Sequence, residues 1–164
     1  MTEFPAAPDP RWTPIQRLRD AALDDLGLAI SLWDGHSAEG PVRGRRIEEK
    51  AIQKCLQDAY ASIEQAMLRM LAYAGDPKPV GGNWHEDLLV MATNASRGRP
   101  AFARHLHAEL DELRRFRHVA VHGYIGFKLM RAAPAVHAGR RLLAGLPAAF
   151  DAFGRDFGLL PPSA

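Results

Sequence analysis

The sequence predicts an all-α protein, built as an antiparallel bundle of four to five helices. Apolar residues recur three or four positions apart over long stretches, the spacing that places them on one face of a helix. Segments rich in glycine and proline separate these stretches. No stretch alternates apolar and polar residues in the way that a half-buried strand requires. We therefore expect helices that pack side by side and are joined by modest loops.

The 164 residues fit a single domain, and we expect residues 13–158 to form it. Three prolines among the first ten residues predict a flexible arm over residues 1–12. Residues 159–164, which contain two adjacent prolines, predict a short tail.

The first helix is expected to begin at Thr13 and to continue to about Trp33. Thr13 can cap the helix, Pro14 suits the first helical position, and Gln16 can complete a capping box. Its apolar stripe consists of Ile15, Leu18, Ala22, Leu26 and Ala29. Residues 34–44 contain three glycines and a proline and predict a loop.

A long second helix is expected over residues 45–74, and a short third helix after it. The second helix has a continuous stripe of Ile52, Cys55, Leu56, Ala59, Ile63, Ala66, Met67, Met70 and Leu71. Residues 75–77, Gly-Asp-Pro, predict its end. Asn83 is expected to cap the third helix, with Glu86 three positions on, and this helix continues to about Ala95.

Two further helices complete the expected bundle. The fourth begins near Ala101 and extends toward Met130, although two glycines near its end weaken it. Its stripe consists of Phe102, Leu106, Leu110, Leu113, Arg117, Ala120 and Tyr124. The fifth begins at Pro134 and ends before Gly158.

Composition and charge exclude several classes of protein. The single cysteine, Cys55, allows no internal disulfide, which fits a reducing compartment. No signal peptide and no run of about 20 apolar residues is present, so we expect a cytoplasmic protein that does not contact a membrane. A formal net charge of +2 is not the signature of a polyanion-binding protein. Basic residues do cluster at 43–46, 114–117 and 140–141, and arginine suits phosphate.

The fourth helix carries polar groups on a stripe that should be buried. Arg117 and Tyr124 are seven residues apart, which places them about 20° from each other around the helix. An arginine there is costly unless it meets an acceptor or lines a cleft. A buried ion pair with Asp20, Asp24 or Glu64 from a neighbouring helix is one solution, and it does not exclude catalysis.

At the end of this helix, Arg117 is followed after four residues by His122, and then by Gly123 and Tyr124. This pattern resembles the motif of the HEPN superfamily, and most closely that of the HepT-like ribonuclease toxins of HEPN/MNT toxin–antitoxin pairs. Residues 60–64, 84–89 and 113–118 also resemble a HepT-like branch. The similarity covers most of residues 45–128.

The resemblance implies a metal-independent endoribonuclease that works as a homodimer, with two motifs facing one cleft. It assigns catalytic roles to Arg117 and His122. It also implies a nucleotidyltransferase antitoxin of the MNT type as partner, which attaches AMP to Tyr124 and so blocks the cleft. His118 departs from the asparagine or other polar residue that many relatives have after the arginine, and we give it a supporting role.

The residue types suit cleavage of RNA, which carries its own nucleophile in the 2′-hydroxyl. Histidine can serve as acid or base near neutral pH, and arginine can stabilise the charge that develops on the phosphate. Arg117 and His122, however, lie about 140° apart on a straight helix. Either the helix bends or ends near Gly123, or residues of two subunits meet across a dimer cleft, and we favour the second.

Other interpretations of the same residues remain. His118 and His122 are one turn apart and can share a metal ion, but two ligands are too few, so we expect no metal and no other cofactor. His85 is either structural or a contact to the cleft or the antitoxin. The chain as a whole is alternatively a catalytically silent HEPN-type module that binds a nucleotidyltransferase, or an unrelated helical adaptor in which the motif is a coincidence.

Overall fold

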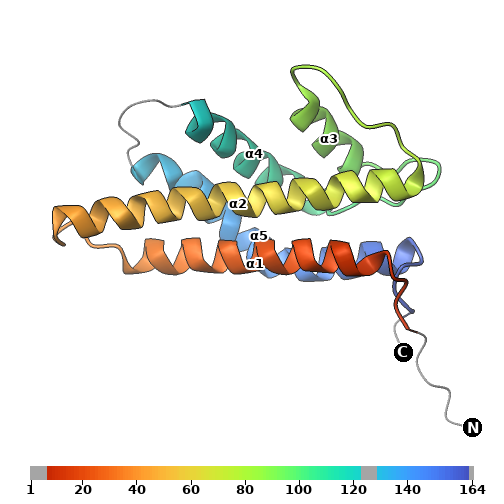
Figure 1. The fold of residues 1–164 in the computed structure, drawn as a ribbon, viewed down its shortest axis with the longest axis horizontal. Coiled ribbons are helices and arrows are strands. Elements are labelled where there is room, and N and C mark those ends of the chain that lie inside the picture. The colour runs from red at the N-terminus through yellow and green to blue at the C-terminus, as the bar shows by residue number, and fades with distance from the viewer. Residues whose placement is uncertain (1–6, 123–128, 163–164) are drawn as a thin grey trace, which may run out of the picture.

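The computed structural model describes residues 7–122 and 129–162, and only the helical backbone of residues 120–122. Within these residues it contains five α-helices and no β-strand, so the expected all-α bundle is confirmed (Figure 1). The α-helices are α1 (Trp12–Gly35), α2 (Val42–Ala74), α3 (Trp84–Thr93), α4 (His107–His122) and α5 (Ala133–Asp156). Two short 3-10 helices, η1 (Arg104–Leu106) and η2 (Leu129–Ala132), precede α4 and α5.

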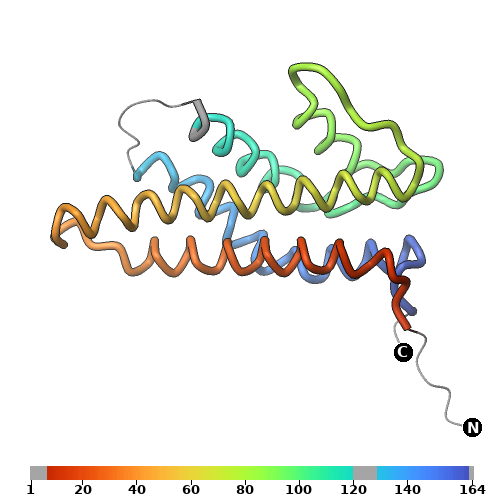
Figure 2. The backbone as a smooth tube through the Cα atoms, viewed as in Figure 1, coloured from red at the N-terminus to blue at the C-terminus, as the bar shows by residue number. Residues whose placement is uncertain are grey.

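Helix α2 lies at the centre of the bundle: its contact with α1 is the most extensive between any two helices, and it also packs against α3, α4 and α5. Helices α1 and α2 run antiparallel along most of their length, while α3 and α4 lie on another side of α2 (Figures 1 and 2). Helix α5 packs against both α1 and α4 and closes the core. The described ends of the chain meet, since the Asp9 amide donates to the Leu159 carbonyl at 2.9 Å.

The buried residues follow the apolar stripes that the sequence predicts. Every predicted stripe residue of α2 is buried. Phe102, which precedes η1, and Leu110 and Leu113 of α4 are buried as well. The ring of Phe102 meets Phe150 edge to face, at a centroid distance of 4.8 Å. Such contacts place the aromatic side chains of the α4 and α5 segments in one core.

One glycine of α5 allows a close contact between the two ends of the chain. A Cβ atom on Gly154 would lie 2.7 Å from Leu160 Cδ1 and 2.9 Å from Trp12 Cζ3, well inside van der Waals distance. Glycine at this position therefore lets Trp12, at the start of α1, pack directly on the α5 backbone.

The helix ends partly differ from the expectation. Gly75 ends α2 as predicted, in the left-handed conformation at φ 73°, and its amide donates to the Ala72 carbonyl. Helix α1 begins at Trp12, so the predicted Thr13 cap is wrong: Asp9 instead accepts a hydrogen bond from the Arg11 amide just before the helix. Asn83 precedes α3 as expected, but its side chain makes no capping hydrogen bond.

The start of the fourth helix was predicted six residues too early. Ala103 has a left-handed backbone, at φ 48°, and the chain then forms η1 before α4 begins at His107. The turn is compatible with burial of Phe102, whose amide donates to the Ala92 carbonyl at 2.8 Å. Apolar spacing alone does not distinguish this turn from a helical start.

Arg99 fixes the position of α3. Its side chain is almost fully buried, and its Nε donates to Asp76, just beyond the end of α2, at 2.8 Å. Its terminal nitrogens donate to backbone carbonyls at the end of α3, including those of Met91 and Ala92. The guanidinium thus satisfies carbonyl groups that a helix end leaves open, and it ties α3 to the end of α2.

Among the described residues, we find no helix with both the length and the apolar character that crossing a bilayer would require.

Candidate active site

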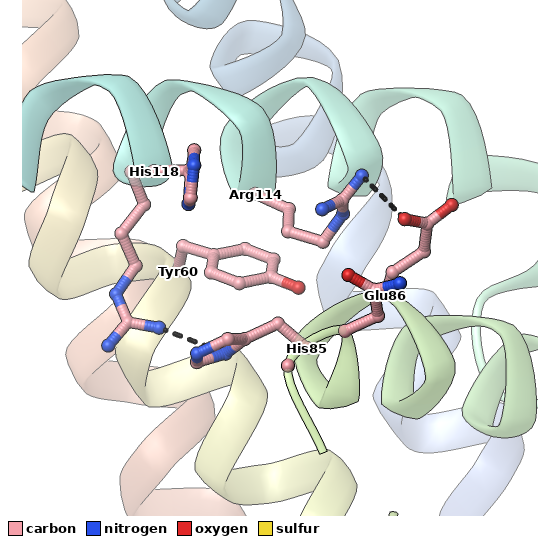
Figure 3. A pocket seen from close by; sticks show the side chains of 8 residues that line it. Tyr60, His85, Glu86, Arg114 and His118 are labelled. Carbon is pink, nitrogen blue, oxygen red and sulfur yellow. Dashed lines mark hydrogen bonds and ion pairs between the residues drawn. The ribbon is translucent and has the colours of Figure 1, made fainter. Parts of the chain in front are cut away.

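A pocket of about 270 Å³ opens where α2, α3 and α4 meet. It is lined by Tyr60, Gly82, Asn83, His85, Glu86, Arg114, Arg117 and His118 (Figure 3). Two arginines and two histidines against one carboxylate make its lining predominantly basic. Arg117 is the residue of the sequence motif that this pocket includes, so the predicted arginine faces a cavity and is not enclosed in the core.

Glu64 is the acceptor that offsets the cost of placing the charged Arg117 on the apolar face of α4. It lies on α2 with a side chain that is 3% exposed, and its Oε1 accepts a hydrogen bond from Arg117 Nη1 at 3.0 Å. Of the three acidic partners considered from the sequence, the structure thus selects Glu64 over Asp20 and Asp24. An ion pair with one partner buried and one partly exposed orients the guanidinium without withdrawing it from the pocket, since Arg117 is 31% exposed.

The same carboxylate holds His85 of α3. Nδ1 of His85 lies 2.5 Å from Glu64 Oε2, and 3.4 Å from Arg117 Nη1. Because an ionised carboxylate only accepts hydrogen bonds, Nδ1 carries a proton and donates a hydrogen bond to Glu64 Oε2. His85 is also held by Trp84, whose ring centroid is 3.6 Å away. Of the two interpretations of His85, structural or cleft residue, the structure supports both: it joins α3 to α2 and it lines the pocket.

Tyr60 forms the floor of the pocket, and its hydroxyl makes no hydrogen bond to the described residues. The residue lies one helical turn before Glu64 on α2 and is fully buried. Burial, and secondarily the nearby Glu64 carboxylate, raises the pKa of the phenol, so the group stays a neutral donor at ordinary pH. In Figure 3 its hydroxyl points toward the side of the pocket that Arg114 and Glu86 occupy.

Arg114 forms the opposite wall and already has acidic partners. It contacts Asp111 at 2.8 Å on its own helix, and Glu86 of α3 more loosely at 3.8 Å. These contacts offset its charge and join α4 to α3 across the pocket mouth. Arg117 differs from Arg114 in the burial of its carboxylate partner, because the Glu64 side chain is almost fully buried while those of Asp111 and Glu86 are more exposed.

The structure places the remaining predicted site residues only in part. His118 lines the pocket beside Arg117. His122 is the last described residue of α4, but its side chain lies outside the described residues, as does the whole of Tyr124. The helical backbone of α4 is continuous from Arg117 to His122.

A family model described as "HepT-like protein" matches residues 51–157, about two thirds of the chain. The chain belongs to the HepT-like family. The resemblance of the chain to the HepT-like branch of the HEPN superfamily is thereby confirmed. The matched segment contains every residue that lines the pocket, and Glu64 as well. Neither the curated proteins nor the solved structures include a match to this HepT-like chain.

Sequence reasoning missed Tyr60 and Arg114 as pocket residues of this HepT-like protein. A usable signal was present in α2, where Tyr60 and Glu64 are four residues apart among stripe residues that are otherwise apolar. A phenol and a carboxylate one turn apart on a buried face need partners, and those partners indicate a site. Arg114 is harder to find, since it belongs to a basic cluster that also resembles a solvated helix face.

Proposed function

We propose that this chain is a ribonuclease toxin that cleaves RNA through attack of the 2′-hydroxyl on the adjacent phosphate. HepT-like proteins are generally associated with ribonuclease toxins. The observation that carries the proposal is the placement of Arg117, held by the buried Glu64 at the wall of a basic pocket. A single phosphate group fits a site in which oriented cationic donors surround a small cavity.

Arg117 is proposed to bind the scissile phosphate. A guanidinium has five N–H donors, and the Glu64 contact uses one of them through Nη1. The remaining donors can form hydrogen bonds with phosphate oxygens and stabilise the charge of the transition state. Tyr60 Oη, which has no described partner, supplies a further donor at the pocket floor. His118 is proposed to support binding at the rim.

His122 is proposed as the base that removes the 2′-hydroxyl proton. Its spacing from Arg117 on the continuous helix α4 favours a homodimer, in which one subunit provides the arginine and the other the histidine. The reaction requires no metal in this proposal. It leaves a 2′,3′-cyclic phosphate on one product and a 5′-hydroxyl on the other.

An MNT-type nucleotidyltransferase is proposed as the antitoxin, with Tyr124 as the residue that receives AMP. The phosphodiester of the attached AMP adds one negative charge, which would occupy the phosphate site at Arg117. The protein should be co-expressed with a nucleotidyltransferase that is encoded beside it. Mass spectrometry should then detect an increase in its mass that corresponds to one attached AMP. The added mass should be absent from Tyr124→Phe. Unmodified wild-type protein under these conditions would contradict the modification and leave binding as the means of inhibition.

Growth and cleavage assays test the nuclease itself. Expression of the wild type without an antitoxin should slow growth, and purified protein should cleave RNA in the presence of a chelator. Arg117→Ala and His122→Ala should each lose about 100-fold or more in rate. Arg155→Ala, which changes an exposed arginine of α5 outside the pocket, is the matched control and should retain activity. Equal toxicity of the wild type and both site variants would refute the proposal.

The catalytically silent binding module is the second candidate. The ion pair of Arg117 with Glu64 joins α4 to α2, and this structural role gives the arginine a purpose that does not require catalysis. A module of this kind would bind a nucleotide or the antitoxin with no cleavage of RNA. Tight binding of RNA or AMP by a wild type that does not cleave RNA would support it.

A further inference from the structure

His85 of α3 has one ring nitrogen committed and one available. Nδ1 donates to Glu64 Oε2, so Nε2 is the nitrogen left for a ligand. Among the described residues Nε2 makes no hydrogen bond, and the side chain is 34% exposed where it lines the pocket. A histidine fixed through one nitrogen by a carboxylate, with the other nitrogen facing a cavity, is oriented for transfer of a proton.

The charges around His85 complement the charge of a bound phosphate. Glu64 is one buried negative charge shared by Arg117 and His85. With His85 protonated, these three residues carry a net charge of +1, which the single charge of a phosphodiester neutralises. The groups that face His85 are Glu64 and Tyr60 of α2, Arg114, Arg117 and His118 of α4, and Glu86 of its own helix.

We propose that His85 is the general acid of RNA cleavage, with Nε2 protonating the 5′-oxygen that leaves while Glu64 orients the ring through Nδ1. This inference rests on the proposed ribonuclease function. It adds to the sequence motif a catalytic residue from a different helix, 32 positions before Arg117. It also resolves a difficulty of the motif, which supplies one proposed base in His122 and no separate acid.

The proton and electron balance of the step is complete. The 2′-oxygen forms a bond to phosphorus, and its proton passes to the base, the role proposed for His122. The bond between phosphorus and the 5′-oxygen breaks, and its electron pair leaves with that oxygen. The 5′-oxygen takes the proton of His85 Nε2, and the neutral imidazole then regains a proton from water. Arg117 stays charged throughout.

The decisive experiment changes the leaving group. A dinucleotide whose 5′-bridging oxygen is replaced by sulfur has a leaving group that needs no proton, so loss of a general acid should matter little for it. His85→Asn is the informative variant, because the asparagine amide can still donate to Glu64 and keep α3 in place. We expect it to lose about 100- to 10,000-fold in rate on ordinary RNA. On the sulfur substrate it should lose less than about tenfold.

Controls separate this inference from the proposed function. His137→Asn changes an exposed histidine of α5 outside the pocket and should leave both rates unchanged. If the wild type cleaves neither substrate, or if Arg117→Ala retains full activity, the proposed function has failed. If both behave as proposed and His85→Asn retains its rate on ordinary RNA, or loses equally on both substrates, the role of His85 as acid is wrong.

A measurement on the wild type alone covers the case in which His85→Asn does not fold. A general acid must hold its proton, so the rate on ordinary RNA should decline as pH rises past the range in which imidazole titrates. The sulfur substrate should not show this alkaline decline. The same alkaline decline with both substrates would overturn the inference.

Discussion

Arg117 of α4 and Glu64 of α2 are 53 residues apart in the sequence, and their side chains form an ion pair of 3.0 Å at the wall of the basic pocket. The pair is asymmetric, because the carboxylate is buried while the guanidinium is partly exposed. Burial of a lone carboxylate is costly, and here two donors offset the cost, one from α4 and one from α3. Glu64 is therefore the point at which the three helices of the site are joined.

Replacement of Glu64 should lower stability and activity together. Glu64→Ala removes the acceptor of both Arg117 and His85 and leaves a small cavity, so we expect a loss of about 2–4 kcal/mol in the free energy of unfolding. Glu64→Gln keeps an acceptor and should lose less. Urea unfolding followed by circular dichroism measures both. The idea that Glu64 joins the helices would be wrong if the midpoint for Glu64→Ala equalled that of the wild type.

Removal of the Tyr60 hydroxyl should separate stability from binding. Its Oη is buried without a described partner, so Tyr60→Phe should leave stability unchanged or raise it by up to about 1 kcal/mol. If the hydroxyl donates to a bound phosphate, the same change should weaken binding of a non-cleavable RNA analogue by about 5- to 10-fold. Thermal melting and fluorescence anisotropy make the comparison. A destabilised Tyr60→Phe with unchanged affinity would indicate a structural role for the hydroxyl.

Arg99 offers a test of how α3 is held. Arg99→Met removes a buried guanidinium and leaves the carbonyls at the end of α3 without donors, so we expect a loss of about 3–5 kcal/mol. Hydrogen exchange should show the amides of α3 losing protection before those of α2. Arg97→Met, at an exposed position two residues earlier, is the matched control. Uniform loss of protection across both helices would mean that Arg99 acts on the whole bundle.

The sequence was sufficient for the presence of the helices and for their buried faces, though not for every helix start, because apolar stripes are local. The stripe from Ile52 to Leu71 is visible in the order of residues and is fully buried in α2. The site was only partly predictable. Arg117 was identified from its conflict with a buried stripe, but the choice of Glu64 among three acidic residues depends on how α2 and α4 cross.

His85 shows why the remaining contacts of the site could not be predicted from the sequence. Its contact with Glu64 depends on the position of α3, which is fixed in turn by Arg99 and by the loop that precedes the helix. None of these long-range contacts has a periodic signature in the sequence. Helix starts were uncertain for a related reason, since the left-handed Ala103 turn obeys the same apolar spacing as a helix.

Alanine substitutions at two glycines separate the effect of close packing from that of intrinsic helix propensity. Gly154→Ala would place a Cβ 2.9 Å from the Trp12 ring and 2.7 Å from Leu160, and the rigid indole cannot move aside without shifting α1. We expect a loss of about 1–3 kcal/mol. Gly27→Ala lies inside α1 with no atom within 4 Å of the new Cβ, and it should gain about 0.5–1 kcal/mol because alanine favours the helix. Thermal or urea unfolding of the two variants should therefore move the midpoint in opposite directions, and equal shifts of the same sign would contradict the close contact between α5 and Trp12.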